Sequence, residues 1–344
     1  MPLPAPTALF DWLAERLPDI SEPLTLRQFP SGQSNPTFAL EMPGKRLVLR
    51  AKPGGPLLPS AHQIEREFRV LGALRDTAVP VPRVLLLCSD PAVWGTPFYI
   101  MEYLEGRVLT DPALPELAPA ERRALYESAF TTLADLHRID FRAVGLADYG
   151  RAEGYLARQV SRWTTQYRAS QTVPIPSMDA LIAWLPEHLP AHDEAAIAHG
   201  DYRLPNLMFA FGQPQVTGVL DWELSTIGHP LLDLAYALLM HEVPLDIVRG
   251  MGGSAALEGV PGIPNSVELI AVYARRAQRE PPTDLRFFLA LALFRSAAIM
   301  QGIRQRIIVG NAAGGPQAQA RAALAPLFAE AGWRLAAATP AGNR

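Results

Sequence analysis

The chain has 344 residues, a formal net charge of −3, and 49% hydrophobic against 19% charged residues. This is the composition of a globular protein with one large domain or two lobes, and it excludes an intrinsically disordered chain. The slightly negative charge gives no support to a nucleic-acid binder held by a basic surface. Cys88 is the only cysteine, which excludes an intrachain disulfide and a cysteine-based zinc site.

Neither a signal peptide nor a membrane span is predicted. The N-terminal segment has no basic region, and it carries Asp11 and Glu15 within its apolar stretch. The longest apolar run, residues 287–294, is bounded by arginines and is too short to cross a bilayer, which takes about 20 residues. We therefore expect a cytoplasmic protein without a membrane span.

The first third of the chain predicts one helix followed by a small antiparallel sheet. Phe10, Leu13 and Leu17 recur at the spacing of an amphipathic helix. Apolar and β-branched runs separated by turn residues then indicate strands, a linker and a second helix. In chain order these are strands 24–29, 37–42 and 46–50, a linker at 53–59, a helix led by a capping box of Ser60 and Gln63, and strands 84–87 and 98–102.

From Gly106 onward the chain is predicted to be mostly helical. Apolar residues at helical spacing indicate helices over residues 121–136, 154–167, 177–185, 234–240, 268–276, 285–308 and 317–337. A strand hairpin around residues 197–220 interrupts them. We therefore expect an α+β chain of two lobes, an antiparallel-sheet N-lobe over residues 1–105 and a large, mostly helical C-lobe over residues 106–344.

The hairpin carries the polar residues that are most informative about chemistry. His199, Asp201 and Asn206 occur in the order H-x-D-x-x-x-x-N, and the apolar run 216–220 leads to Asp221. This is the spacing of the protein-kinase catalytic loop, followed by an aspartate where kinases carry D-F-G. The alternative is a hairpin whose polar residues only cap its turns. That alternative does not explain the offset of Asn206 together with a strand that ends in an aspartate.

Phosphoryl transfer explains why these residue types occur together. The reaction needs an aligned hydroxyl acceptor and neutralised phosphate charge. Asp201 is placed to accept the proton of the acceptor hydroxyl. Asn206 and Asp221 bring hard oxygen ligands for Mg²⁺. His199 is interpreted as a structural residue that holds the loop through its ring.

HGDYRLPN followed by LDWELSTIGHPLLDLAY resembles the aminoglycoside phosphotransferase (choline kinase-like) family. The similarity is greatest to the branch that also occurs fused to acyl-CoA dehydrogenases, and it covers nearly the whole chain. The resemblance implies a bilobal protein-kinase-like fold, ATP and Mg²⁺ as cofactors, and phosphorylation of a hydroxyl group on a small molecule. It also implies that His137 is a packed structural residue, and Asp233 is interpreted as a helix cap or a loop-bracing residue.

The resemblance assigns residues to the ATP phosphates. The turn with Gly32 and Ser34 lies where kinases fold a loop over the ATP phosphates. Gly32 permits a close approach of the backbone to the phosphates, and the Ser34 hydroxyl can donate a hydrogen bond to a phosphate oxygen. Arg50 stands where kinases place a phosphate-binding lysine, and Glu67 is the expected brace of Arg50. Lys52, just beyond the strand, is the alternative cation.

The segment FYIMEYLEG matches the family's hinge between the lobes. The backbone C=O and N–H groups of Glu102 and Leu104 would bind adenine, with Met101 behind the ring. Backbone recognition leaves side-chain identity almost free, so these three assignments follow from the alignment alone.

The chain departs from the family pattern at three positions. Arg50 replaces the lysine, and Asp221 is followed by Trp-Glu in place of Phe-Gly. Pro205 stands where relatives often place an aspartate, and proline removes an N–H and stiffens the loop. The number of bound Mg²⁺ ions therefore stays open.

Arginines are concentrated in two segments expected to wall the acceptor site. Residues 141–180 contain five arginines and residues 265–310 contain seven, each segment with three acidic residues. This charge favours an anionic acceptor over a polycationic antibiotic, although internal ion pairs would weaken the inference. The resemblance points to a hydroxy acid or a hydroxyacyl-CoA. Trp163, Trp184 and Phe288 are candidates for an acyl path, with burial in the core as the alternative.

Two other functions remain open at this point. An amino-alcohol or aminoglycoside kinase would need an acidic acceptor pocket. The second is a nucleotide-binding module without turnover, which is considered because Pro205 replaces an aspartate beside Asn206. The expected partner is a small-molecule acceptor and not a nucleic acid, and the oligomeric state is open, a homodimer included.

Overall fold

The computed structural model describes residues 6–29, 35–54, 63–310 and 315–338. Gly32 and Ser34, predicted to bind the ATP phosphates, lie outside these ranges, as does Ser60 of the predicted capping box.

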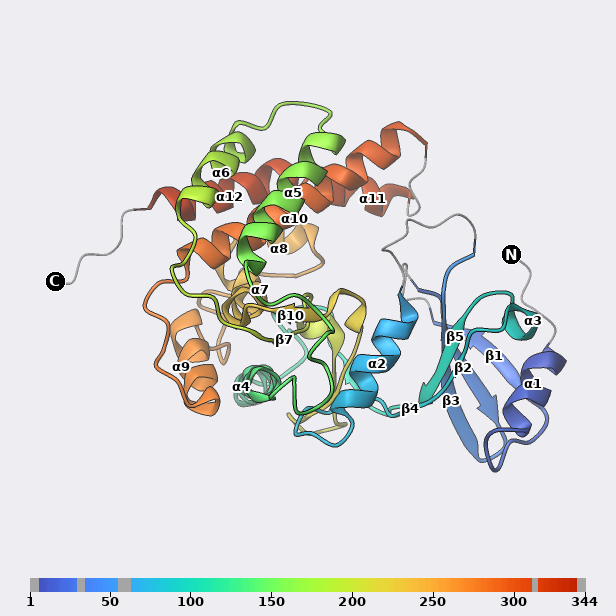
Figure 1. Cartoon of the computed structure of the whole chain (residues 1–344). Helices are drawn as coiled ribbons and strands as arrows, with labels where there is room; N and C mark the ends of the chain where they lie inside the picture. Colours follow the sequence, from blue (N-terminus) through green and yellow to red (C-terminus); the bar gives the residue numbers. More distant parts are fainter. Residues whose placement is uncertain (1–5, 30–34, 55–62, 311–314, 339–344) are drawn as a thin grey trace.

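An antiparallel sheet forms the N-terminal part of the molecule (Figure 1). Its strands are β1 (Thr25–Gln28), β2 (Thr37–Met42), β3 (Lys45–Ala51), β4 (Val84–Cys88) and β5 (Phe98–Glu102), in the order β1-β2-β3-β5-β4. Successive side chains of a strand point to opposite faces. Phe98 and Ile100 therefore join the apolar cluster under α1 (Pro6–Ala14) and α3 (Pro91–Trp94), whereas Tyr99 between them faces α2 (Ile64–Leu74). Arg50 is the register partner of Tyr99.

Helix α2 lies between the sheet and the helical part (Figure 1). Its buried residues Ile64, Glu67, Val70, Leu71 and Leu74 recur at helical spacing and form one face. The apolar members of that face belong to the larger core cluster, which continues into the helical part. The predicted capping box is wrong, since Gln63 is itself the N-cap residue and makes no side-chain capping bond.

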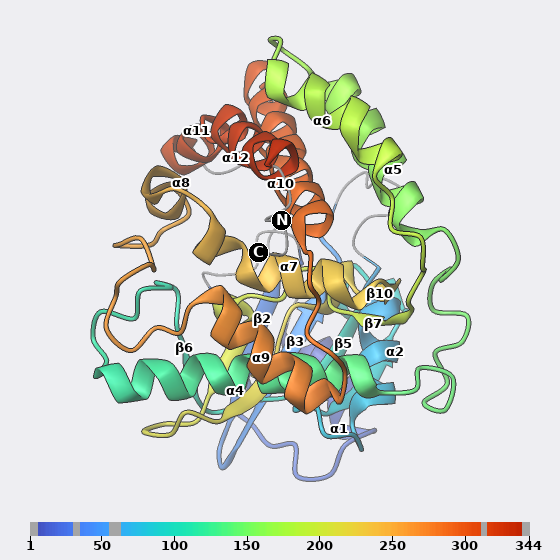
Figure 2. The same ribbon diagram turned by 90° about the vertical axis from the view of Figure 1, so that its left-hand side faces the viewer.

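The rest of the chain is mostly helical, as predicted. Its helices are α4 (Pro119–Arg138), α5 (Tyr155–Ser170), α6 (Pro176–Glu187), α7 (Pro230–Glu242), α8 (Leu245–Gly250), α9 (Ser266–Ala277), α10 (Arg286–Ile308), α11 (Gly315–Ala322) and α12 (Ala325–Ala337). Helix α10 runs through the centre and packs against α5, α6, α7, α11 and α12, while α4 and α9 lie side by side (Figure 2). Within the described ranges α10 alone has the length and hydropathy of a membrane span, and 78% of that window is buried inside the fold.

Two small antiparallel sheets carry the predicted catalytic hairpin. One pairs β7 (Ala196–Ala198) with β10 (Thr226–Gly228), and the other has the order β6 (Arg107–Val108), β8 (Leu207–Phe209), β9 (Val216–Val219). Two 3₁₀ turns, η1 (Leu204–Asn206) and η2 (Trp222–Leu224), lie within the hairpin and directly after it.

The predicted α+β class is confirmed, with corrections to single elements. The helix predicted over 317–337 is two helices, because Pro326 lacks the N–H that a continuous helix would need there and instead occupies the first turn of α12. The helix predicted over 234–240 begins earlier, at Pro230, since proline fits the first helical position. Sequence reasoning missed the short elements α3, α8 and β6.

Candidate active site

The His199 ring holds the loop that follows β7. Its Nε2 lies 2.8 Å from the carbonyl oxygen of Leu220, and its Nδ1 accepts a hydrogen bond from the Asp201 backbone N–H at 3.2 Å. Because Nδ1 accepts, Nε2 carries the proton and donates to the carbonyl group. His199 thus ties the loop to the segment that ends in Asp221, and its predicted structural role is confirmed.

Asp233, on α7, braces the same loop from behind. Its carboxylate oxygens accept the backbone N–H groups of His199 at 2.6 Å and Gly200 at 2.8 Å. The N-cap of α7 is His229, so the interpretation of Asp233 as a cap is wrong and the loop-bracing interpretation is right. Burial alone would raise the pKa of Asp233, but the hydrogen bonds from His137 and from the Gly200 backbone N–H bring this pKa below its usual value.

Asp233→Asn should destabilise the fold by about 1–3 kcal/mol, because an amide oxygen cannot replace both carboxylate oxygens and leaves a buried N–H without an acceptor. A depressed folded-state pKa contributes stability above the unfolded pKa, and that stability is lost as pH falls through the folded pKa. The native protein should therefore lose stability below about pH 4. In a plot of unfolding free energy against pH, the variant should lack the part of this loss that comes from protonation of Asp233. Urea unfolding measured between about pH 3 and about pH 7 tests both effects.

The matched control for this test is Asp246→Asn, an exposed aspartate in the first turn of α8. Its unfolding free energy should stay within about 0.5 kcal/mol of the native value. Identical pH profiles for the native protein and Asp233→Asn would contradict the bracing role.

Asn206 is held against Asp201. The Asn206 Nδ2 group donates to both Oδ2 and the backbone oxygen of Asp201, each at 2.8 Å. Both partners are acceptors, which identifies the facing atom as the amide nitrogen. In the part of the chain that the structure describes, the Asn206 Oδ1 atom makes no hydrogen bond, so a hard oxygen is left for a cation.

Two further side chains contact Asp201. Arg203 Nε lies 3.2 Å from Asp201 Oδ2. Burial raises the pKa of the Tyr236 hydroxyl most, and the charge of Asp201 and a hydrogen bond to it raise this pKa further. Sequence reasoning missed both contacts. Asp201 itself keeps 16% of its side chain exposed, which leaves it accessible to a substrate.

Pro205 fits the loop without disturbing Asn206. It lies at the start of the 3₁₀ turn η1, where the backbone N–H of another residue would have no partner within the turn. The next N–H, that of Asn206, donates to the Arg203 carbonyl at 2.9 Å. The proline therefore costs the loop no backbone hydrogen bond.

Arg50 is the centre of a buried charge cluster between the sheet, α2 and the Asp221 segment. Its Nε lies 2.7 Å from Glu67 Oε2, a charge contact rather than an aligned hydrogen bond, and its Nη2 lies 2.6 Å from Asp221 Oδ1. Burial alone would lower the pKa of Arg50, but the negative charges of Glu67 and Asp221 raise it above its ordinary value. The expected ion pair between Arg50 and Glu67 is thus present, and Arg50 also reaches Asp221.

Glu67 has partners that sequence reasoning missed. Asn35 Nδ2 donates to Glu67 Oε1 at 2.6 Å, and the Tyr99 hydroxyl donates to Oε2 at 3.2 Å. Glu67 is only 1% exposed, so burial raises its pKa while Arg50 opposes that shift. Asn35, Glu67 and Tyr99 are not linked by any short spacing in the sequence. The strand register and the packing of α2 bring them together.

The alternative cation, Lys52, is paired elsewhere. Its Nζ lies 2.9 Å from Glu65 Oε1, and both side chains are partly exposed. Glu65 is therefore an ion-pair partner on the helix surface, and Arg50 is the cation that faces Asp221.

Asp221 adopts a left-handed backbone conformation with φ of 64° and leaves 37% of its side chain exposed. Such a conformation is uncommon outside glycine and often occurs at functional sites. No group of three His, Cys, Asp or Glu side chains in the described ranges could hold a metal ion. The oxygens of Asn206 and Asp221 nevertheless suit Mg²⁺, which commonly takes one or two protein oxygens and completes its shell with phosphates and water.

The predicted hinge lies beside the strand that leads to Asp221. Met101 is partly buried on β5, and the Glu102 backbone N–H already donates to the Arg83 carbonyl at 2.9 Å. A Cβ atom on Gly218 of β9 would lie 2.6 Å from Leu104 Cδ1, which shows how closely β9 approaches the Leu104 side chain. The contacts of these residues with adenine remain predictions.

Four of the arginines counted in the two basic segments are in ion pairs. Arg168 pairs with Asp179, Arg276 with Asp135, Arg279 with Glu194 and Arg286 with Asp284. Of the three acyl-path candidates, Phe288 is buried in the core, Trp184 stacks on His188, and Trp163 lies half-buried beside Arg295. The charge inference therefore rests on the arginines without acidic partners.

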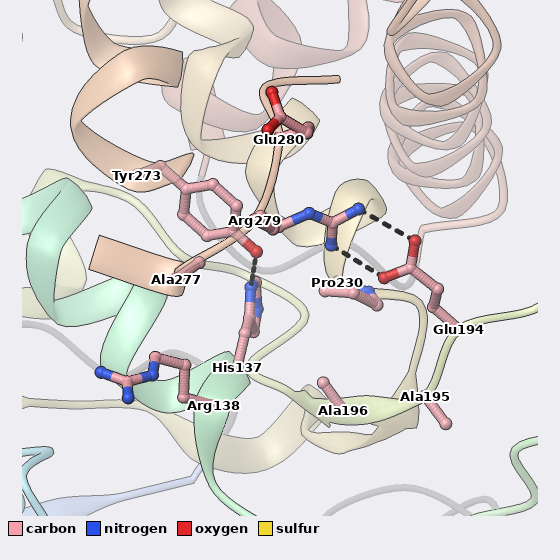
Figure 3. Close-up of a pocket in the computed structure, with 10 residues that line it drawn as sticks. All are labelled: His137, Arg138, Glu194, Ala195, Ala196, Pro230, Tyr273, Ala277, Arg279 and Glu280. Atoms are coloured by element: carbon pink, nitrogen blue, oxygen red, sulfur yellow. Dashed lines mark hydrogen bonds and ion pairs between the residues drawn. The ribbon is translucent and has the colours of Figure 1, made fainter. Parts of the chain in front are cut away.

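A cavity of about 450 Å³ is lined by residues from the end of α4, from β7 and from the end of α9 (Figure 3). Arg279 forms two hydrogen bonds to Glu194 across it, and His137 Nδ1 lies 2.8 Å from the Tyr273 hydroxyl. His137 Nε2 lies 3.5 Å from Asp233 Oδ2 on the other side, which confirms His137 as a packed structural residue. None of the predicted site residues that lie in the described ranges lines this cavity.

The chain is similar to known phosphotransferases in sequence and structure. The phosphotransferase enzyme family matches residues 25–265. Acyl-CoA dehydrogenase family member 11 of Gallus gallus is 49% identical over 292 residues, which cover 84% of this chain and 38% of that protein. A crystal structure from Ralstonia eutropha JMP134, provisionally described as an aminoglycoside phosphotransferase, is 43% identical with a TM-score of 0.86 and covers 96% of this chain and 98% of that one.

A more distant structure shares only the fold. A thermostable mutant of aminoglycoside phosphotransferase APH(4)-Ia, in ternary complex with ADP and hygromycin B, is 16% identical with a TM-score of 0.60 and covers 92% of this chain and 95% of that one. The predicted kinase-like fold is therefore confirmed. So is the resemblance to the branch that is linked with acyl-CoA dehydrogenases, although the chain spans only 38% of the length of the Gallus gallus relative.

Proposed function

Because the chain belongs to the phosphotransferase enzyme family, we propose that it is an ATP- and Mg²⁺-dependent kinase of a hydroxyl group on an anionic hydroxy acid or hydroxyacyl-CoA. The chain is a small-molecule phosphotransferase. The observation that carries the finer proposal is the meeting of Asp201 and Asn206 on one loop with Asp221 and Arg50 beside it.

In the proposed reaction each residue has one task. Asp201 takes the proton of the acceptor hydroxyl group. The oxygen of that hydroxyl group bonds to the γ-phosphorus of ATP, and the bond between the γ-phosphorus and the oxygen that leaves with ADP breaks. Arg50, braced by Glu67, contacts the phosphates through its guanidinium group. Asn206 and Asp221 would hold Mg²⁺, which when bound neutralises phosphate charge. ATP as donor is supported by the ADP complex of the structure that shares the fold.

The proposed acceptor class rests on charge and on the relatives. Arg295 and Arg304 have no ion-pair partner within the described ranges, and unpaired cationic side chains suit an anionic substrate. The similar Gallus gallus protein is named an acyl-CoA dehydrogenase family member, which supports an acyl group on the acceptor.

Release of ADP from MgATP should rise with a hydroxy acid or a hydroxyacyl-CoA and not with choline or an aminoglycoside. The measurement is a coupled ADP assay over that panel, with Asp201→Asn as the inactive control. Stimulation by choline or an aminoglycoside alone would replace the acceptor class with the amino-alcohol or aminoglycoside alternative. MgATP binding without stimulation by any acceptor would favour the nucleotide-binding module without turnover. That alternative depends on Pro205, and it is weakened because Pro205 fits the turn η1.

A further inference from the structure

Arg295, on α10, is a cation with no acidic partner among the residues that the structure describes. Its guanidinium carbon lies 5.5 Å from the centre of the Trp163 ring and 5.2 Å from that of Tyr236. Its Nε atom is buried and makes no hydrogen bond. No carboxylate within the described ranges forms an ion pair with it, whereas four other arginines of the two basic segments are paired. A partly buried guanidinium group that lies against two rings, with a buried N–H that has no acceptor, favours a ligand that can accept its hydrogen bonds.

Arg295 lies one side chain away from Asp201. Tyr236 lies about one turn after Asp233 on α7, and the Asp233 carboxylate accepts the backbone N–H groups of His199 and Gly200, directly before Asp201. Burial raises the pKa of the Tyr236 hydroxyl most, the charge of Asp201 raises it further, and the charge of Arg295 lowers it. The ring of Tyr236 thus separates the predicted base from the unpaired guanidinium group. Helix α10 packs against both α5, which carries Trp163, and α7, which carries Tyr236, so the three side chains are held by packed helices.

We propose that Arg295 is a specificity-determining residue that binds the acyl oxygens of the acceptor and so positions its hydroxyl group at Asp201. This inference rests on the proposed function and names the residue that selects the acceptor class. The acyl oxygens are either the carboxylate of a free hydroxy acid or the thioester carbonyl of a hydroxyacyl-CoA. A planar guanidinium group offers parallel N–H donors to either, and only the carboxylate also neutralises its charge. The half-buried Trp163 ring offers an apolar wall for the carbon chain of the acceptor, between its acyl oxygens and its hydroxyl group.

The test compares two arginines that contact the same ring. Arg295→Met should lower kcat/KM for a hydroxy acid by about 10- to 100-fold, mostly through KM, because the lost contact binds ground state and transition state alike. MgATP affinity should stay within a few-fold. Arg162→Met is the matched control: Arg162 also lies 5.5 Å from the Trp163 ring centre, but its side chain is exposed, and kcat/KM should change by less than about threefold.

Three acceptors identify the bound group: a hydroxy acid, its CoA thioester and the matching diol without an acyl group. A loss in Arg295→Met for the free acid alone identifies the carboxylate, and a loss for the thioester identifies the carbonyl. The diol should be a poor acceptor of the native enzyme and equally poor for the variant. Arg295→Lys, which keeps the charge but not the planar donors, should recover part of the loss and supplies the test if Arg295→Met fails to fold.

Two results overturn the inference. Either kcat/KM for the acyl acceptor is unchanged in Arg295→Met, or it falls equally for the diol. Failure of the proposed function looks different: no member of the panel then stimulates ADP release by the native enzyme, whatever residue stands at position 295.

Discussion

Asp201→Asn should lower kcat for phosphoryl transfer by about 10³-fold, with the affinity for MgATP unchanged within a few-fold. The amide cannot take a proton at neutral pH. Its oxygen can still accept the Asn206 Nδ2–H, so the loop should keep its geometry. Single-turnover kinetics with the best acceptor of the panel would measure the loss, and nucleotide titration would measure the affinity.

The position of Asp201 in the network explains why this substitution separates chemistry from binding. The residue contacts Arg203 and Asn206, but within the described ranges it forms no hydrogen bond or ion pair with the Arg50 cluster that is predicted to hold the phosphates. Tyr236→Phe is a suitable comparison, since it removes one neighbour of the base and keeps the carboxylate. Turnover of Asp201→Asn at a rate near that of the native enzyme would remove Asp201 as the base.

Asp221→Ala should weaken Mg²⁺-dependent nucleotide binding by about 10- to 100-fold. The carboxylate lies 2.6 Å from Arg50 Nη2 and is the more exposed partner of that ion pair. Its loss removes one of two predicted oxygen ligands and leaves Arg50 with Glu67 at 2.7 Å and the more distant Glu223 at 4.0 Å. Titration of ATP with Mg²⁺ and with EDTA should show a large metal effect for the native protein and almost none for the variant.

Glu223→Gln is the matched control for Asp221. It removes a carboxylate from the same short segment, but one that lies 4.0 Å from Arg50 Nη2. Its Mg²⁺-dependent affinity should stay within about threefold of the native value, because a weak charge contact at that distance contributes little. An Asp221→Ala protein whose nucleotide affinity still depends on Mg²⁺ as strongly as the native one would exclude Asp221 from the metal site.

The catalytic loop could be predicted from the sequence because its information is local. His199, Asp201 and Asn206 lie within one short segment, and Asp221 ends the strand that follows. The type and order of the main helices and strands were predictable for the same reason, since apolar periodicity sets which face of an element is buried. Element ends were less predictable: Pro326 divides a helix that periodicity alone predicts as continuous.

The partners of each charged side chain were decided only by the tertiary structure. Composition shows two arginine-rich segments, but it does not show that Arg276 pairs with Asp135 and Arg279 with Glu194 while Arg295 lies between two rings. Asp233 likewise accepts two N–H groups from a loop more than thirty residues earlier in the chain. Such contacts depend on how helices and strands pack against one another, and periodicity, which reports only the buried face of each element, does not contain that information.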